Sequence, residues 1–231
     1  MKFLHVLLLL TIASCQPAPA QDVHTYIPTN ARTYLPTLKT QVSELMPGFS
    51  EPHYFAALIE HESCISLTHS RCWNPTSRLK TAREEGAGLG QLTRAYRQDG
   101  SLRFDALSDS KRLDPRGLNE LRWDTIYQRP DLQIRVIVLM TRQNLNRLAN
   151  LTPNPLPFAD AAYNGGLGGV LNERRACAST PSCDPNLWFG HVELTCLKSR
   201  TPIYGTRSAC DINRHHVYDV IQTRMPKYRS V

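Results

Sequence analysis

The sequence predicts a mainly helical fold with at most a small β-hairpin, stabilised by disulfide bonds. Several segments repeat their apolar residues at the i, i+3, i+4, i+7 spacing of a helix face. No segment alternates apolar and polar residues over a sustained length, as a half-buried strand would. Six cysteines follow the N-terminal region, an even number that suits three disulfides.

Two helices are predicted near the start of the domain. The earlier one tolerates Pro36 in its first turn and ends at Pro47, which the helix-stopping Gly48 follows. The later one spans residues 52–63, with Ser50 as its N-terminal cap. The apolar positions of the earlier helix are Leu35, Leu38, Val42, Leu45 and Met46.

The middle of the chain is less regular. A small hairpin fits within residues 64–88. Residues 85–93 are rich in glycine and predict a tight turn that enters a helix. Residues 98–116 are charged and predict an irregular segment.

The strongest helix signal begins at Pro130. This helix is apolar on much of its surface, which predicts a place at the centre of the core. A shorter helix over residues 157–164 stops at Gly165 and Gly166. Asp211 is the predicted cap of a last helix. The apolar residues of the strongest helix are Leu132, Ile134, Val136, Val138, Leu139, Met140 and Leu145.

Composition and charge limit the function classes. The chain has 231 residues and a formal net charge of +7. A basic balance suits an anionic polymer, either nucleic acid or an acidic cell-wall polymer. Nucleic acid is not an expected partner, because no run of lysine and arginine is interleaved with aromatic residues.

Residues 1–20 indicate an export signal. Lys2 precedes an apolar stretch, residues 6–13, that is too short to span a membrane. Residues 12–15 resemble a bacterial lipobox, in which Cys15 would be lipidated, and we favour this ending because Cys15 directly follows the apolar stretch. The alternative is ordinary cleavage after Ala20, which would give a soluble periplasmic or secreted protein.

The chain is expected to hold one domain behind this signal. Residues 21–34 are mostly polar and predict a tether or an N-terminal arm. Residues 35–231 predict the domain itself, with a helical, disulfide-containing extension at its C-terminal end. We therefore expect a periplasmic protein that a lipid at Cys15 anchors to the membrane.

The cysteines agree with export into an oxidising compartment. Six cysteines allow 15 pairings, and we predict the sequential one because each bond then closes a short loop. A zinc site is the competing interpretation, but the chain lacks paired CxxC units, so no metal is expected. The predicted pairs are Cys64 with Cys72, Cys177 with Cys183 and Cys196 with Cys210.

Glu62 is the candidate catalytic residue. It occupies the last position of an apolar series formed by Phe55, Leu58 and Ile59 on one helix face. In an apolar setting the charged form of a carboxyl is disfavoured, so its pKa rises and it can act as a general acid. The competing interpretation is an ordinary solvated carboxylate.

Three motifs in chain order carry a family resemblance. They are Glu62-Ser63 at a helix end, Gly-Leu-Gly-Gln at residues 88–91, and Ala-Tyr-Asn-Gly-Gly at residues 162–166. Together they resemble the lysozyme-like lytic transglycosylases, most of all the soluble-type catalytic domain with its phage and prophage relatives. The resemblance covers about residues 50–170. Gly90 departs from the family, which usually has methionine there.

The resemblance implies a lysozyme-like fold and a lytic transglycosylase activity. Such an enzyme cleaves the β-1,4 bond between MurNAc and GlcNAc in peptidoglycan glycan strands and leaves a 1,6-anhydro end. Glu62 would act first as acid and then as base. No cofactor and no second protein partner are implied, so a monomer is expected.

The resemblance also implies supporting roles. Tyr163 would lie beside Glu62 near the acetamido group of the sugar. Gln91 would hold the sugar together with the backbone at Gly88 and Leu89. Ser63 would bond the acid or the substrate. Asn164 would hold its helix end in shape.

Each of these residues also has a purely structural interpretation. Ser63 could be a helix-end residue, Tyr163 a core aromatic and Asn164 a C-terminal cap. His215 and His216 are predicted to be packed or exposed, without a functional role.

Two alternatives remain open at this level. A hydrolysing muramidase or chitinase would need a second carboxylate to hold water, from Asp99, Asp105 or Asp109. Glu60 cannot serve, because it points to nearly the opposite face of the Glu62 helix. A non-catalytic wall-binding lipoprotein is the other alternative, which Gly90 keeps open.

Overall fold

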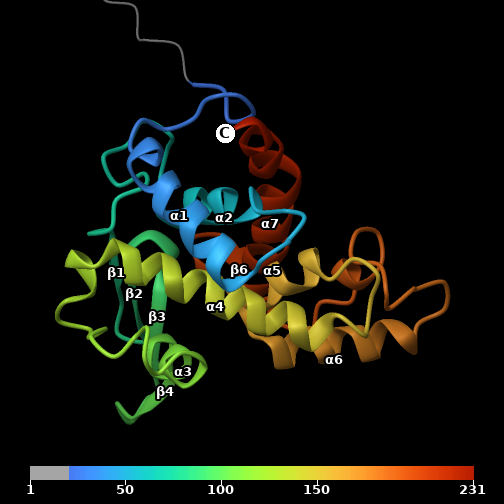
Figure 1. Cartoon of the computed structure of the whole chain (residues 1–231). Coiled ribbons are helices and arrows are strands. Elements are labelled where there is room, and N and C mark those ends of the chain that lie inside the picture. Colours follow the sequence, from blue (N-terminus) through green and yellow to red (C-terminus); the bar gives the residue numbers. More distant parts are fainter. Residues whose placement is uncertain (1–20) are drawn as a thin grey trace, which may run out of the picture.

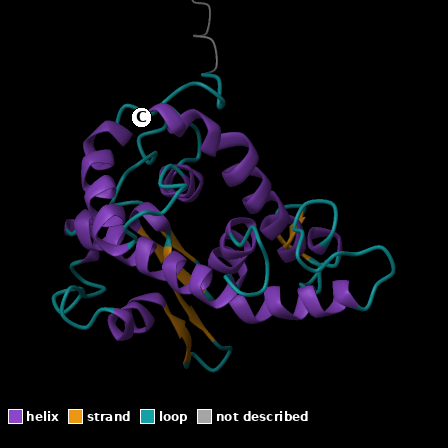
Figure 2. Ribbon diagram, turned by 45° about the vertical axis from the view of Figure 1, so that its right-hand side comes forward, coloured by secondary structure: helices purple, strands orange, loops and turns teal. Residues whose placement is uncertain are grey.

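Seven α-helices, two antiparallel sheets and three disulfides make up residues 21–231, the part of the chain that the computed structural model describes (Figure 2). The expected mainly helical, disulfide-stabilised fold is confirmed. Residues 1–20 lie outside the described part, and with them the predicted export signal, both of its possible endings and Cys15. None of the described helices is long and apolar enough to cross a membrane.

The regular elements follow one another as Figure 1 labels them. The helices are α1 (Ala31–Leu45), α2 (Tyr54–Ser63), α3 (Ala106–Leu113), α4 (Pro130–Leu148), α5 (Leu156–Gly165), α6 (Leu167–Ala178) and α7 (Ala209–Tyr218). The strands are β1 (Arg78–Lys80), β2 (Glu84–Ala87), β3 (Leu92–Tyr96), β4 (Leu102–Asp105), β5 (Pro202–Tyr204) and β6 (Arg207–Ser208). Short 3₁₀ helices are η1 (Gly88–Gly90), η2 (Ile126–Gln128), η3 (Val192–Leu194) and η5 (Met225–Ser230), and η4 (Asp219–Arg224) is a π-helix.

Helix α4 lies at the centre of the core, as its sequence predicts. Ile134 and the three residues Val136, Ile137 and Val138 are fully buried. On its sides α4 contacts α1, α3, α5 and the η1 turn, so it joins the sheet half of the molecule to the α5–α6 half (Figure 1).

Helix α2 is buried on nearly every side, in part by the last segment of the chain. All side chains from Tyr54 to Glu60 are buried. The helix begins at Tyr54, and Ser50 does not cap it: His53 holds the cap position without a side-chain bond. Helices α1, η1, η4 and η5 surround α2, so the last segment of the chain packs directly on it.

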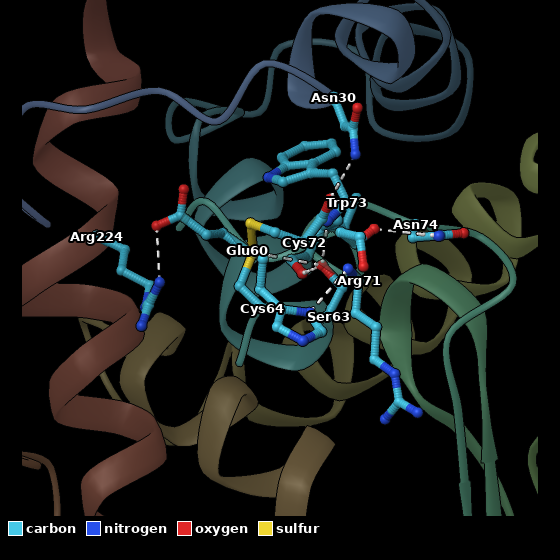
Figure 3. The surroundings of a disulfide bond; sticks show 12 residues. Asn30, Glu60, Ser63, Cys64, Arg71, Cys72, Trp73, Asn74 and Arg224 are labelled. Atoms are coloured by element: carbon cyan, nitrogen blue, oxygen red, sulfur yellow. Dashed lines mark hydrogen bonds and ion pairs between the residues drawn. A yellow bond between two sulfur atoms is a disulfide. The ribbon is translucent and has the colours of Figure 1, made fainter. Parts of the chain in front are cut away.

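A buried group of charges fixes that contact. Glu60 is fully buried, and one of its oxygens accepts hydrogen bonds from Lys227 Nζ at 2.6 Å and Arg224 Nη1 at 2.8 Å. Its other oxygen accepts from the Tyr228 hydroxyl at 2.5 Å. Figure 3 shows the Glu60–Arg224 pair. Both cations are brought to α2 from the C-terminal helical turns.

The sheet is larger than the hairpin that the sequence predicts. Strands β1 to β4 form one antiparallel sheet in chain order, in which Gly86 pairs with Thr93. The glycine-rich turn enters strand β3 rather than a helix, and β4 and α3 occupy much of residues 98–116, the predicted irregular segment. The strands have only 3–5 residues, too few for their alternation to be recognised in the sequence.

All three predicted disulfides are confirmed: Cys64–Cys72, Cys177–Cys183 and Cys196–Cys210. The first closes the loop directly after α2 (Figure 3). The Cys72 carbonyl of this loop accepts a hydrogen bond from Asn30 Nδ2 at 3.0 Å. The disulfide loop therefore holds the start of α1 against the end of α2.

Two helix limits differ from the sequence predictions, and one helix was not predicted. Helix α1 begins at Ala31, inside the predicted arm of residues 21–34, because Ala31 is buried and Asn30 is bonded to the disulfide loop. Helix α6 was not predicted, since only three of its residues are buried. Ser208 caps α7, and Asp211 completes the capping box as the third residue of the helix instead of forming the cap itself.

The Glu60 network gives a first prediction. Glu60→Gln leaves the buried Lys227 ammonium without its anion and removes one of the two carboxylates that pair with the partly buried Arg224, and we expect a loss of about 3–5 kcal/mol in the free energy of unfolding. Denaturant unfolding followed by circular dichroism measures it. Glu120→Gln is the matched control, because the Glu120 side chain is 69% exposed and, within residues 21–231, pairs only with Arg129. Equal losses in the two variants would contradict this account.

Candidate active site

A cleft of about 1060 Å³ opens beside the end of α2. Residues of the sheet, of α4 and α5, and of the segment around β5 line it. Residues from all three motifs reach its wall: Glu62 and Ser63, then Gln91, then Tyr163 and Asn164. The predicted site residues Gly88 and Leu89 are buried and do not line the cleft.

Glu62 stands at the edge of the core rather than inside it. Its apolar companions Phe55, Leu58 and Ile59 are fully buried, whereas the Glu62 side chain is 15% exposed at the cleft. Its Oε1 atom lies 2.8 Å from Nε2 of His216. The expected purely apolar setting is thus wrong, because the last turn of α2 meets a polar group that approaches from α7.

His216 continues a buried chain of hydrogen bonds behind Glu62. Its Nδ1 lies 2.8 Å from Oδ2 of Asp160, and the other Asp160 oxygen accepts a bond from the Tyr54 hydroxyl at 2.9 Å. His216 is 1% exposed and Asp160 is fully buried. The chain therefore runs from the cleft through Glu62, His216 and Asp160 to Tyr54.

The two carboxylates decide the charge of the imidazole. Burial alone would lower the pKa of His216, but the charge of Asp160 and the hydrogen bonds to Asp160 and Glu62 outweigh burial and raise that pKa to about 10. His216 is therefore an imidazolium at neutral pH and donates from both nitrogens. Burial and the nearby Asp160 charge also raise the pKa of Tyr54, which keeps its hydroxyl as a donor.

Sequence reasoning missed both His216 and Asp160. His216 was assigned no functional role, and nothing in its helix pattern distinguishes it from a packed residue. Asp160 carried a usable signal, because it is the only charged residue within the apolar helix of residues 157–164. A buried carboxylate needs a partner, so that position predicts a polar contact in the core without naming the other residue.

Tyr163 takes the place that the missing side chain at residue 90 would fill. Its hydroxyl donates to the Gly90 carbonyl at 2.8 Å. A Cβ atom on Gly90 would lie 2.5 Å from Ile137 Cγ1 and 2.6 Å from the Tyr163 hydroxyl oxygen. Glycine at residue 90 thus opens no gap in the wall, because Ile137 and Tyr163 already occupy the space.

The turn that carries Gln91 is fastened to α4. Gln133, fully buried on α4, accepts from the Leu89 amide at 2.8 Å and donates to the Ile126 carbonyl at 2.7 Å. Gly88 has a φ of +71°, and a Cβ there would overlap Gln133, so only glycine fits. Gln91 Nε2 donates to the Gly88 carbonyl at 2.9 Å, which holds the Gln91 side chain at the cleft.

Ser63 and Asn164 are bonded to the scaffold. The Ser63 hydroxyl donates to the Ile59 carbonyl at 2.7 Å and accepts from the Trp73 amide at 2.9 Å. Asn164 Oδ1 accepts from Asn213 Nδ2 at 2.9 Å. Ser63 therefore joins the disulfide loop to α2, and Asn164 joins the end of α5 to α7.

The three aspartates considered for a hydrolase lie apart. Asp99 is exposed in the turn between β3 and β4, where it accepts from the Ser101 amide at 2.9 Å. Asp105 caps α3 through the amides of Leu107 and Ser108. Only Asp109 lines the cleft, paired with Arg112.

Positive charges outnumber negative ones around the cleft. Its negatively charged lining residues are Glu62, Glu84 and Asp109, and its positively charged ones are Arg71, Arg78, Arg83, Arg103, Arg147 and Lys198. Such a wall favours an anionic ligand. Within residues 21–231, no three histidine, cysteine, aspartate or glutamate side chains are grouped so that they could bind a metal ion.

Comparison with known proteins adds no relative. No family model matches the chain, and neither a curated protein nor a solved structure does. The candidate site therefore stands on its own geometry.

The packing around Gly90 gives a second prediction. Gly90→Ala places a methyl group against Ile137 and the Tyr163 hydroxyl, and we expect a loss of about 1–3 kcal/mol in the free energy of unfolding. Gly168→Ala is the control, since a Cβ at Gly168 meets no atom within 4 Å. Thermal unfolding of both variants measures the difference. A Gly90→Ala protein as stable as the control would show that the space is not filled.

Proposed function

We propose that the protein is a lytic transglycosylase that cleaves the MurNAc–GlcNAc β-1,4 bond of peptidoglycan and leaves a 1,6-anhydro-MurNAc end. One observation supports this most: Glu62, Gln91 and Tyr163, which belong to three separate sequence motifs, all line the same cleft. A chance combination of weak motifs would have no reason to meet at one cavity.

The proposed reaction needs one proton-exchanging group. Glu62, in its protonated form, gives its proton to the leaving glycosidic oxygen while positive charge grows at the anomeric carbon. The N-acetyl group of the muramic ring assists at that carbon. The Glu62 carboxylate then takes the proton from the C6 hydroxyl, whose oxygen bonds to the anomeric carbon. Glu62 is protonated again at the end of the reaction, and no water is consumed.

The neighbours of Glu62 suit this sequence of steps. Tyr163 is bonded to the Gly90 carbonyl, so its ring is fixed as a wall of the cleft. Burial, followed by the Glu62 charge, raises the pKa of Tyr163 well above its usual value, so its hydroxyl stays protonated. Gln91 stands on a turn that α4 holds rigid. A preorganised wall of this kind lowers the cost of positioning the sugar.

The charge of the cleft supports peptidoglycan over an uncharged polymer. Peptidoglycan carries free carboxylates on its stem peptides, and on those lactyl groups that bear no peptide, whereas chitin is neutral. A wall rich in arginine would attract the former. The three disulfides suit a periplasmic enzyme, because such bonds persist in oxidising compartments. We keep a lipid anchor at Cys15 and a monomeric state as parts of the proposal.

A third prediction concerns the products on purified peptidoglycan. The wild type should release muropeptides with anhydro ends, and Glu62→Gln should release none, because the amide cannot give a proton. Mass spectrometry of the soluble products measures this. Glu120→Gln, which alters an exposed carboxylate outside the cleft lining, should match the wild type. Binding without any release by the wild type would instead select the wall-binding alternative.

Hydrolysis is the second candidate, because Asp109 lines the cleft. Our fourth prediction is that Asp109→Asn keeps the same anhydro products and lowers the rate less than tenfold, because the C6 hydroxyl replaces water in the reaction. Asp99→Asn, in the exposed turn, is the matched control. A loss of a hundredfold or more in Asp109→Asn alone, with reducing ends among the wild-type products, would favour a hydrolase.

A further inference from the structure

We propose that His216, held by Asp160, is a positioning residue that stabilises the Glu62 carboxylate and leaves Glu62 Oε2 as the only oxygen that exchanges protons with substrate. This inference rests on the proposed function, since it assigns a reaction to Glu62. It concerns residues from three separate elements, α2, α5 and α7, that meet behind the cleft wall.

The geometry gives the two oxygens of Glu62 different partners. Oε1 accepts from His216 Nε2 at 2.8 Å. Oε2 has no hydrogen-bond partner among the described residues, and Glu62 lines the cleft. One oxygen is thus occupied inside the protein and the other remains for the sugar. The carboxyl group cannot rotate to exchange them without breaking the bond to the imidazolium.

The His216–Asp160 pair differs from the buried Glu60 network, because it ends on a carboxylate that lines the cleft. His216 and Asp160 are both almost completely buried, and burying ions costs several kcal/mol per group before their attraction offsets it. Apolar side chains of similar size would join α5 and α7 at lower cost. A buried ion pair that ends on a carboxylate at a cleft is typical of a functional site.

Other titratable groups surround the imidazole, and they form a second, separate network. His61 lies with its ring centroid 4.4 Å from that of His216, and its Nδ1 lies 2.6 Å from Asp219 Oδ2. The attraction of His61 and Arg224 outweighs burial and lowers the pKa of Asp219, so Asp219 stays ionised beside them. The titratable groups in contact with His216 are Glu62 and His61 from α2 and Asp160 from α5. Tyr54 bonds to Asp160, His215 packs against His61, and Asp219 of η4 pairs with both His61 and Arg224.

These contacts indicate which atoms carry protons at each step of the proposed reaction. Before cleavage, Glu62 carries a proton on Oε2, and His216 carries protons on both nitrogens. When Oε2 gives its proton to the leaving oxygen, the negative charge that forms on Glu62 faces the His216 cation. Oε2 then takes the proton of the C6 hydroxyl. His216 keeps both protons throughout, so it stabilises the intermediate carboxylate without entering the reaction.

Our fifth prediction is a titration of His216 by imidazole NMR in the whole chain. In the wild type, His216 should stay doubly protonated through neutral pH and titrate near pH 10. Both Glu62→Gln and Asp160→Asn remove an anionic partner, and each should lower that titration by about one pH unit or more. A wild-type His216 that titrates near its ordinary value of 6.5 would overturn the proposal.

Protein stability offers a second readout of the same charge. A group whose pKa is raised on folding contributes stability that is fully present below its unfolded value of 6.5 and is lost as pH rises towards 10. His216→Gln keeps a donor for Glu62 but removes the charge. The stability advantage of the wild type over His216→Gln should therefore shrink between these pH values. His24→Gln, at an exposed position, is the matched control.

The pH profile of cleavage distinguishes a positioning role from a structural one. His216→Gln removes the positive charge that faces the Glu62 carboxylate, so the pH dependence of kcat/KM in this variant should differ from that of the wild type. Lower activity with an unchanged profile would overturn the proposal. If His216 titrates as expected but the wild type releases no glycan, the reaction assigned to Glu62 fails while the charge network stands.

Discussion

Burial of α2 is the constraint on which the rest of the structure depends. This helix is enclosed on nearly every side, yet it carries two carboxylates, Glu60 and Glu62, that cannot be left without partners. Both receive their cations from the C-terminal region: Lys227 and Arg224 for Glu60, and His216 for Glu62. The last part of the chain must therefore pack on α2 before the candidate site is complete.

The same constraint gives the two carboxylates different chemistry. Glu60 is enclosed by two cations and a tyrosine hydroxyl, so it has no free oxygen and serves to join the elements. Glu62 lies half a turn further along, where the helix reaches the cleft, and one of its oxygens stays free for a ligand. Position along one short helix thus separates a structural acid from a candidate catalytic one.

Local patterns in the sequence predicted the α4 core helix and the disulfide pairs, because helical periodicity and short cysteine spacing act over a few residues. Of the residues that the three motifs indicated, Glu62, Ser63, Gln91, Tyr163 and Asn164 line the cleft, whereas Gly88 and Leu89 do not. The four-stranded sheet escaped prediction since its strands are too short to show alternation. His216 escaped for a different reason. Its contact with Glu62 joins residues 154 positions apart, and only the fold brings them together.

The central claim is that Glu62 works without a second carboxylate, with the sugar's own hydroxyl in place of water. Digestion of peptidoglycan in water labelled with oxygen-18 tests it most directly. A transglycosylase closes the anhydro ring with the C6 oxygen, so mass spectrometry should find no label in the released muropeptides. One labelled oxygen per cleaved bond would contradict the account and make the protein a hydrolase.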